Sequence, residues 1–202
     1  MPVTPVSALW TQTATSLHQE LMFKDFSEAW AYMNAVAVEA EKQDHHPNWS
    51  NVWNTVTIDL TSHDKGNSVT ARDRKLAAAA DEALRQVLKL RAAALAGTFT
   101  EHLVAGRFAE AHALFHPSLD MPLKELKSRF TKMDDKTDPF TQWAVEEEFL
   151  MTEWPDRGAL VMLWAYCGVW GKGLVEAVTV TIAMQPGSPK QLGVASIEFG
   201  RP

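Results

Sequence analysis

The chain has 202 residues, of which 46% are apolar, so it can build one large core or two small ones and is too apolar to be disordered. Its net charge is −6 and no cluster of Lys and Arg stands out, which argues against a nucleic-acid surface. Cys167 is the single cysteine, so no internal disulfide can form, as is usual in a reducing cytoplasm. The first ten residues lack the features of a signal peptide, and the longest apolar stretch, 159–169, is too short to span a bilayer. We therefore expect a cytoplasmic protein with no nucleic-acid or membrane partner.

The first predicted elements are a strand at residues 17–23 and a helix that follows it. Asp25 with Glu28 three residues later forms a capping box, which predicts the start of the helix. The helix should end near Gln43, because Pro47 disfavours the helical conformation of the residue before it. Apolar residues with helical spacing give this helix one face that we expect to contact the core: Phe26, Trp30, Met33, Ala37 and Ala40.

A second strand and a second helix complete the pattern of the first half. Residues 52–61 alternate as a strand, and Thr70 with Asp73 forms another capping box that opens a helix reaching Leu88. This order predicts an α+β fold in which helices cover one face of an antiparallel sheet.

The second half has a different order, with short helices first and strands last. We predict helices at 98–104, 108–115 and 123–133, and then a four-stranded antiparallel meander at 143–152, 159–170, 174–184 and 191–199. The change of order places a domain boundary near residue 95, giving domains 1–94 and 95–202.

Three of the seven histidines, His45, His46 and His63, lie in one short stretch with a tryptophan and several carboxylates. Imidazole exchanges protons near neutral pH, so the stretch indicates an acid–base site for a flat, polar molecule. The predicted helix end before His45 favours a cationic ring there. A zinc site is the alternative, but adjacent histidines rarely direct both rings at one ion and no cysteine is near, so we expect no metal.

A series of motifs in this region resembles the pterin-4a-carbinolamine dehydratase family, over roughly residues 17–84. The motifs are Phe23-Lys24-Asp25-Phe26, then His45-His46-Pro47-x-Trp49-x-Asn51-Val52-x-Asn54, then Leu60-Thr61-x-His63-Asp64, then Thr70-x-x-Asp73-x-x-Leu76-Ala77. The resemblance implies an α+β unit that forms dimers or tetramers through its sheet. It also implies dehydration of 4a-hydroxytetrahydropterin, which regenerates the cofactor of aromatic amino-acid hydroxylases, without a metal or other cofactor. Departures from the family pattern are a short N-terminal segment, Asn48, Trp53 and the turn at 65–68.

The resemblance also implies roles for individual residues. His45, His46 and His63 are the expected catalytic residues: His46 and His63 flank the C4a hydroxyl, and His45 orients the ring or serves as the base. Which histidine is the acid and which the base stays open at this point. The residues expected to bind or position the substrate are Glu41, Asp44, Trp49, Thr61, Ser62 and Asp64.

Residues 95–202 are more faintly similar to nuclear-transport-factor-2-like domains, which are cone-shaped α+β folds with a curved sheet. The features that carry this similarity are Gly106-Arg107-Phe108-x-x-Ala111, the four strands and the closing residues 198–202. Fold likeness alone implies no activity. The alternative to an enzyme is a non-catalytic binding or dimerisation protein, with a decayed pterin site and a ligand-binding C-terminal domain.

Overall fold

The computed structural model describes residue 7 and residues 9–133, 138–149, 161–173, 175–185 and 188–200. The chain divides into two compact units, and the division along its long second helix falls between Leu88 and Lys89. The first unit holds the residues up to Leu88 together with 185–191, and the second holds most of the remainder. No helix in the described ranges is both long and apolar enough to cross a membrane.

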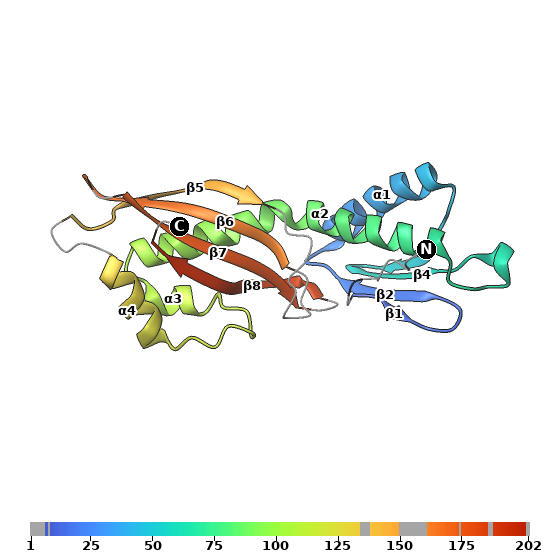
Figure 1. The fold of residues 1–202 in the computed structure, drawn as a ribbon, viewed down its shortest axis with the longest axis horizontal. Helices are drawn as coiled ribbons and strands as arrows, with labels where there is room; N and C mark the ends of the chain where they lie inside the picture. The colour runs from blue at the N-terminus through green and yellow to red at the C-terminus, as the bar shows by residue number, and fades with distance from the viewer. Residues whose placement is uncertain are drawn as a thin grey trace. The chain divides into compact units, whose positions relative to one another are not determined.

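The sheet of the first unit has four antiparallel strands in the order β1-β2-β4-β3 (Figure 1). Side chains alternate along β2 and β4, so that Leu17, Leu21, Val56 and Ile58 are all buried on the face that the helices cover. The α+β class predicted from the sequence is therefore confirmed. The strands are β1 (Thr11–Gln12), β2 (Leu17–Met22), β3 (Asn48–Val52) and β4 (Thr55–Leu60).

The strand predicted at 52–61 is confirmed for Thr55–Leu60, but the chain turns at residues 53–54, so Val52 belongs to a different strand. Val52 pairs with Thr55, and the two residues between them form the turn of a β3–β4 hairpin. Trp53 has a φ of 53° in this turn and is 65% exposed, whereas the Asn54 side chain donates to the Phe23 carbonyl at 2.6 Å. Apolar alternation continues across the turn, and this continuity made two strands look like one.

Helix α1 (Phe26–Gln43) begins as predicted, with the Asp25 side chain accepting the Glu28 N–H at 2.9 Å. The predicted buried face was wrong for its two largest members, since Phe26 and Trp30 are 47% and 50% exposed and stack on each other. The face that packs on the sheet is rotated from the predicted one, because Tyr32 can bury its ring when its hydroxyl donates to Gln19 Oε1. The buried residues of α1 are Ala29, Tyr32, Val36 and Ala40.

Helix α2 (Ala71–Val104) is one continuous helix of 34 residues. Residues 98–104 are helical as predicted, but they belong to α2, which continues past Leu88, and do not form a separate helix. Gly97 does not interrupt the helix. A β-carbon at this position would lie 3.0 Å from the Trp143 ring, so a small residue here permits the close packing of that ring. The boundary predicted near residue 95 falls inside this helix.

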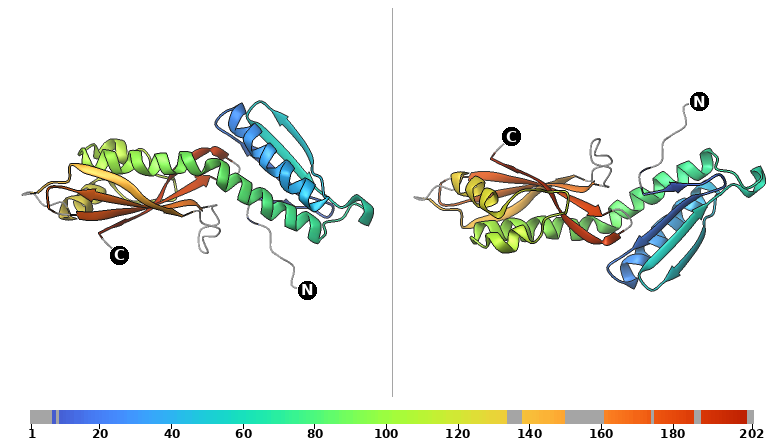
Figure 2. Two further views of the ribbon diagram at one scale, coloured as in Figure 1. Left: turned by 90° about the horizontal axis from the view of Figure 1, so that it is seen from above. Right: turned by 90° about the horizontal axis from the view of Figure 1, so that it is seen from below.

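The second unit contains α3 (Phe108–His112), α4 (Leu123–Met133) and an antiparallel sheet in the order β5-β6-β7-β8 (Figure 2). The α4 bounds and the meander are as predicted, although α3 is shorter than expected. The strands are β5 (Gln142–Phe149), β6 (Val161–Trp170), β7 (Val175–Gln185) and β8 (Ser188–Phe199). Residues 150–152, 159–160 and 174, which the predicted strands included, lie outside the described residues.

Candidate functional site

The C-terminal end of α1 places the first candidate histidine in the interior. Asp44 closes the helix in the left-handed conformation, with a φ of 47°, and the His45 N–H bonds back to the Ala40 carbonyl at 3.1 Å. This reversal directs the His45 side chain inward, where it is only 6% exposed. Asp44 itself stays exposed, so its structural role is to end the helix.

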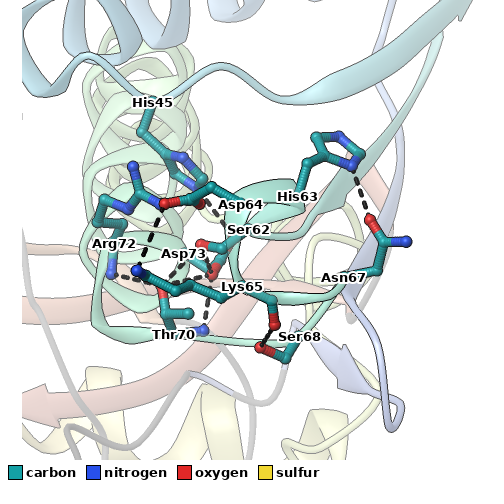
Figure 3. Close-up of polar contacts among 10 residues, drawn as sticks. All are labelled: His45, Ser62, His63, Asp64, Lys65, Asn67, Ser68, Thr70, Arg72 and Asp73. Carbon is teal, nitrogen blue, oxygen red and sulfur yellow. Dashed lines mark hydrogen bonds and ion pairs between the residues drawn. The ribbon is translucent and has the colours of Figure 1, made fainter.

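The His45 ring meets a buried carboxylate at the start of α2. His45 Nε2 lies 2.8 Å from Asp73 Oδ1, and the Asp73 side chain is completely buried. The other carboxylate oxygen accepts the Ser62 hydroxyl at 2.9 Å and the Thr70 backbone N–H at 2.7 Å (Figure 3). The Thr70 hydroxyl also donates to it, at 2.9 Å. One side chain therefore both caps α2 and joins it to the ends of α1 and β4.

These hydrogen bonds fix the charge of Asp73 and the tautomer of His45. Burial by itself would raise the pKa of Asp73, but the hydrogen bonds from the Thr70 backbone, His45, Ser62 and the Thr70 hydroxyl outweigh it and lower that pKa below its ordinary value. The carboxylate can only accept, so His45 carries its proton on Nε2. In this tautomer Nδ1 keeps a lone pair, and it makes no hydrogen bond within the described ranges.

The second histidine lies at the surface beside the first. His46 Nε2 is 3.1 Å from Glu41 Oε1, and the two side chains are 58% and 80% exposed. Glu41 belongs to the last turn of α1, which brings it near the residues that follow the helix. Glu41, expected to bind or position the substrate, therefore pairs with an imidazole, and solvent keeps this pairing weak.

The third histidine begins a single 3₁₀ turn, η1 (His63–Lys65), directly after Ser62. His63 Nδ1 lies 2.9 Å from Asn67 Oδ1, so Nδ1 carries a proton that it donates to this amide oxygen. The ring is exposed and turned toward Asn67 (Figure 3). Sequence alternation placed His63 at a strand end, but the strand stops at Leu60.

The remaining predicted site residues take different positions. Ser62 is buried on Asp73, whereas the carboxylate of Asp64 pairs with Arg72 and lies 3.8 Å from Lys65 Nζ on the exposed loop. Trp49 is half-buried on the edge strand β3. The Thr61 hydroxyl is enclosed and has no hydrogen-bond partner in the described part of the chain. Because side chains alternate along extended backbone, Thr61 points away from the side on which Ser62 meets Asp73.

The structure therefore joins His45 to Ser62 through Asp73, and holds His46 and His63 by separate partners. Asp73 was predicted only as a helix cap. A capping carboxylate has a second oxygen free to bind, but sequence spacing cannot say what reaches it. Among the described residues, no three His, Cys, Asp or Glu side chains are grouped to hold a metal ion.

Comparison with known proteins assigns the family of this first unit. The sequence profile of the family described as pterin 4 alpha carbinolamine dehydratase matches residues 4–83. A Solibacter usitatus protein is 49% identical over 72 residues, which are 36% of this chain and 75% of that protein. A Rhodospirillum rubrum protein is 51% identical over 74 residues, covering 36% of this chain and 76% of the relative. The chain belongs to the pterin-4α-carbinolamine dehydratase family.

Both bacterial relatives carry the pterin-4-alpha-carbinolamine dehydratase name provisionally. A solved Brucella melitensis structure, described as a transcriptional coactivator/pterin dehydratase, is 36% identical and covers 37% of this chain and 81% of that one, with a TM-score of 0.36. The family assignment confirms the resemblance seen in the motifs of the first half. The similarity of residues 95–202 to nuclear-transport-factor-2-like domains stays a prediction.

Proposed function

We propose that the first unit is a hydro-lyase that dehydrates 4a-hydroxytetrahydropterin to the quinonoid dihydropterin, returning a pterin cofactor to use. The buried His45–Asp73 contact carries the proposal, because a carboxylate that fixes the tautomer of an imidazole prepares the other ring nitrogen for proton transfer. Membership of the family supplies the substrate class.

The reaction needs one proton removed and one proton delivered. As the C4a–O bond breaks, the electron pair of the N5–H bond becomes the C4a=N5 double bond, and the hydroxyl leaves as water once it is protonated. Each well-placed acid or base contributes about 10²–10⁴-fold to such a step. No redox partner is required, because the substrate and the products differ only by water.

His45 has the features of the base. Its Nε2–H is held by Asp73, which leaves Nδ1 as the acceptor and stabilises the imidazolium formed when Nδ1 takes the N5 proton. Ser62 and Thr70 keep the carboxylate in place. The sequence left open whether His45 orients the ring or removes the proton, and this geometry supports proton removal.

His46 and His63 are the proposed acids that protonate the leaving hydroxyl. Both are exposed, so each can regain its proton from solvent after turnover. Glu41 Oε1 lies 3.1 Å from His46 Nε2 and orients this ring. Trp49 is the proposed stacking surface for the flat ring, and its half-buried indole on an edge strand suits this role.

A direct rate measurement tests the proposal. The breakdown of 4a-hydroxytetrahydropterin is followed by absorbance, with the purified full chain and with His45→Ala, His46→Ala and His63→Ala. We expect acceleration above the spontaneous rate and a loss of 10²-fold or more in kcat for His45→Ala. No acceleration by the unaltered protein would leave the non-catalytic alternative, and normal turnover of His63→Ala would remove that residue from the mechanism.

We also propose that the protein is a homo-oligomer in which the outer face of α1 contacts a second copy. Phe26, Trp30 and Val38 are each about half exposed there. From residue 29 to residue 38 the helix carries no charged side chain, so an identical face can meet it without like-charge repulsion. Sedimentation of Trp30→Glu should then give a smaller species than the unaltered chain, and an unchanged mass would disprove this contact.

A further inference from the structure

The side-chain carbonyl oxygen of Gln43 is a buried acceptor with no donor among the described residues. Gln43 is the last residue of α1 and lies three residues after the buried Ala40, so it continues the helix face that points inward. An unpaired buried amide oxygen costs about 1–3 kcal/mol. An apolar side chain of similar length would avoid this cost, so stability does not account for a glutamine here.

Gln43 belongs to the same end of α1 as the candidate catalytic groups. It lies between Glu41 and His45 along the chain, and its Cα is at most about 7 Å from that of His45. The residue as a whole is only partly buried, although its amide oxygen is enclosed. Rotation of the terminal amide exchanges its oxygen and its nitrogen and can present either a donor or an acceptor.

Enclosed atoms without partners are few in the described part of the chain. They are side-chain atoms of Gln43, Thr61 and His116, and the Nε atom of Arg91, whose side chain has other interactions. Two of the four lie within twenty residues of one another, on either side of the His45–His46 pair. Of these two, Gln43 is on the helix from which His45 follows, whereas Thr61 points away from Ser62 and Asp73. Gln43 is therefore the unsatisfied group best placed toward the proposed base.

We propose that Gln43 is a substrate-binding residue that hydrogen-bonds the amide-like edge of the pterin ring. This inference rests on the proposed function and adds a contact to it. The edge of a pterin presents N–H donors beside a carbonyl acceptor and is neutral. A carboxamide offers one acceptor and two donors without charge, so it complements that edge better than a carboxylate or an ammonium group does.

The test compares steady-state kinetics and thermal stability of Gln43→Leu with those of the unaltered chain. We expect KM for 4a-hydroxytetrahydropterin to rise at least fivefold, kcat to stay within twofold, and Tm to stay equal or rise. Gln86→Leu is the matched control, since Gln86 is an exposed glutamine that donates to Glu82 on α2, and its KM should not change. A KM for Gln43→Leu within twofold of that of the unaltered chain, with a raised Tm, would overturn the proposal. The buried amide would then lower stability without contributing to substrate binding.

A binding measurement separates this inference from the proposed function on which it rests. Fluorescence titration with 7,8-dihydropterin measures ring binding without turnover, and Gln43→Leu should weaken it at least fivefold. If the unaltered protein is inactive but binds this pterin more tightly than Gln43→Leu does, only the dehydratase reaction is refuted. If the unaltered protein and Gln43→Leu bind it equally, or neither binds it, the Gln43 contact is refuted. Should Gln43→Leu not fold, Gln43→Glu keeps the shape, loses the donors and is judged by the same ratios.

Discussion

Replacing Asp73 with Asn separates the two roles of this side chain, which caps α2 and orients His45. The carboxylate accepts four hydrogen bonds, from the Thr70 N–H, the Thr70 and Ser62 hydroxyls and His45 Nε2, at 2.7–2.9 Å. Asn has a single acceptor oxygen, and the Thr70 backbone N–H requires it on its side. The new NH₂ group then faces His45, which must accept at Nε2 and move its proton to Nδ1.

This tautomer removes the lone pair that takes the substrate proton. In the serine-protease triad the same Asp-to-Asn change preserves geometry and lowers kcat by about 10⁴-fold through the wrong tautomer. We expect a kcat loss of about 10²–10⁴-fold for Asp73→Asn. All four partners stay bonded, but to a neutral amide. Because hydrogen bonds to a charged group contribute about 1.5–3 kcal/mol each and neutral ones about 0.5–1.5 kcal/mol, the free energy of unfolding should fall by up to about 4 kcal/mol.

The assay is turnover of 4a-hydroxytetrahydropterin beside urea unfolding of the same samples. Asp81→Asn is the matched control, because Asp81 is a second buried carboxylate on α2 that accepts from Trp10 and Gln19 and touches no histidine. Its stability should change while kcat stays within twofold. If Asp73→Asn loses stability yet keeps kcat within twofold, then Asp73 is only a helix cap and His45 is not the base it orients.

Three further outcomes follow from the same contacts. Hydrogen bonding lowers the folded-state pKa of Asp73, so this carboxylate stabilises the fold above its unfolded-state pKa of about 3.9 and stops doing so as pH falls through its folded-state pKa. In urea titrations, the difference in the free energy of unfolding between the unaltered chain and Asp73→Asn should therefore narrow below pH 4. Burial raises the folded-state pKa of Asp81, so this group stabilises the fold at pH values below its unfolded-state pKa and loses the effect as pH rises. The Tm of Asp81→Asn minus the Tm of the unaltered chain should therefore increase from pH 4 to pH 7. Gly193→Ala should lower the Tm by an amount equivalent to about 1–3 kcal/mol, because a β-carbon there would lie 2.7 Å from the His116 backbone; an unchanged Tm would show that this backbone moves aside without cost.

The sequence predicted most of the fold where local rules act alone. The Asp25 cap, the α1 end before Pro47, the α4 bounds and the four-stranded meander all followed from capping, proline and alternation. Failures came where a tertiary contact overrode the local pattern. Tyr32 is buried where Gln19 accepts its hydroxyl. Gly97 lies inside a helix at a point where Trp143 packs closely against it.

The sequence named a set of candidate site residues but could not give their arrangement. His45, Glu41 and Ser62 were all expected, and the structure gives each a specific partner. That His45 is buried while His46 is exposed depends on the left-handed turn at Asp44, which no periodicity predicts. Gln43 was missed because a glutamine at a helix end is ordinarily a solvated residue.

Asp73 is the third residue of α2, so the proposed base depends on the first turn of a helix. Helix ends open before helix centres when a protein is warmed. Fraying of this one turn would release the carboxylate, and the imidazole would then be free to exchange its tautomers. The upper temperature of catalysis is therefore expected to follow the melting of these few residues and to lie below the midpoint of cooperative unfolding.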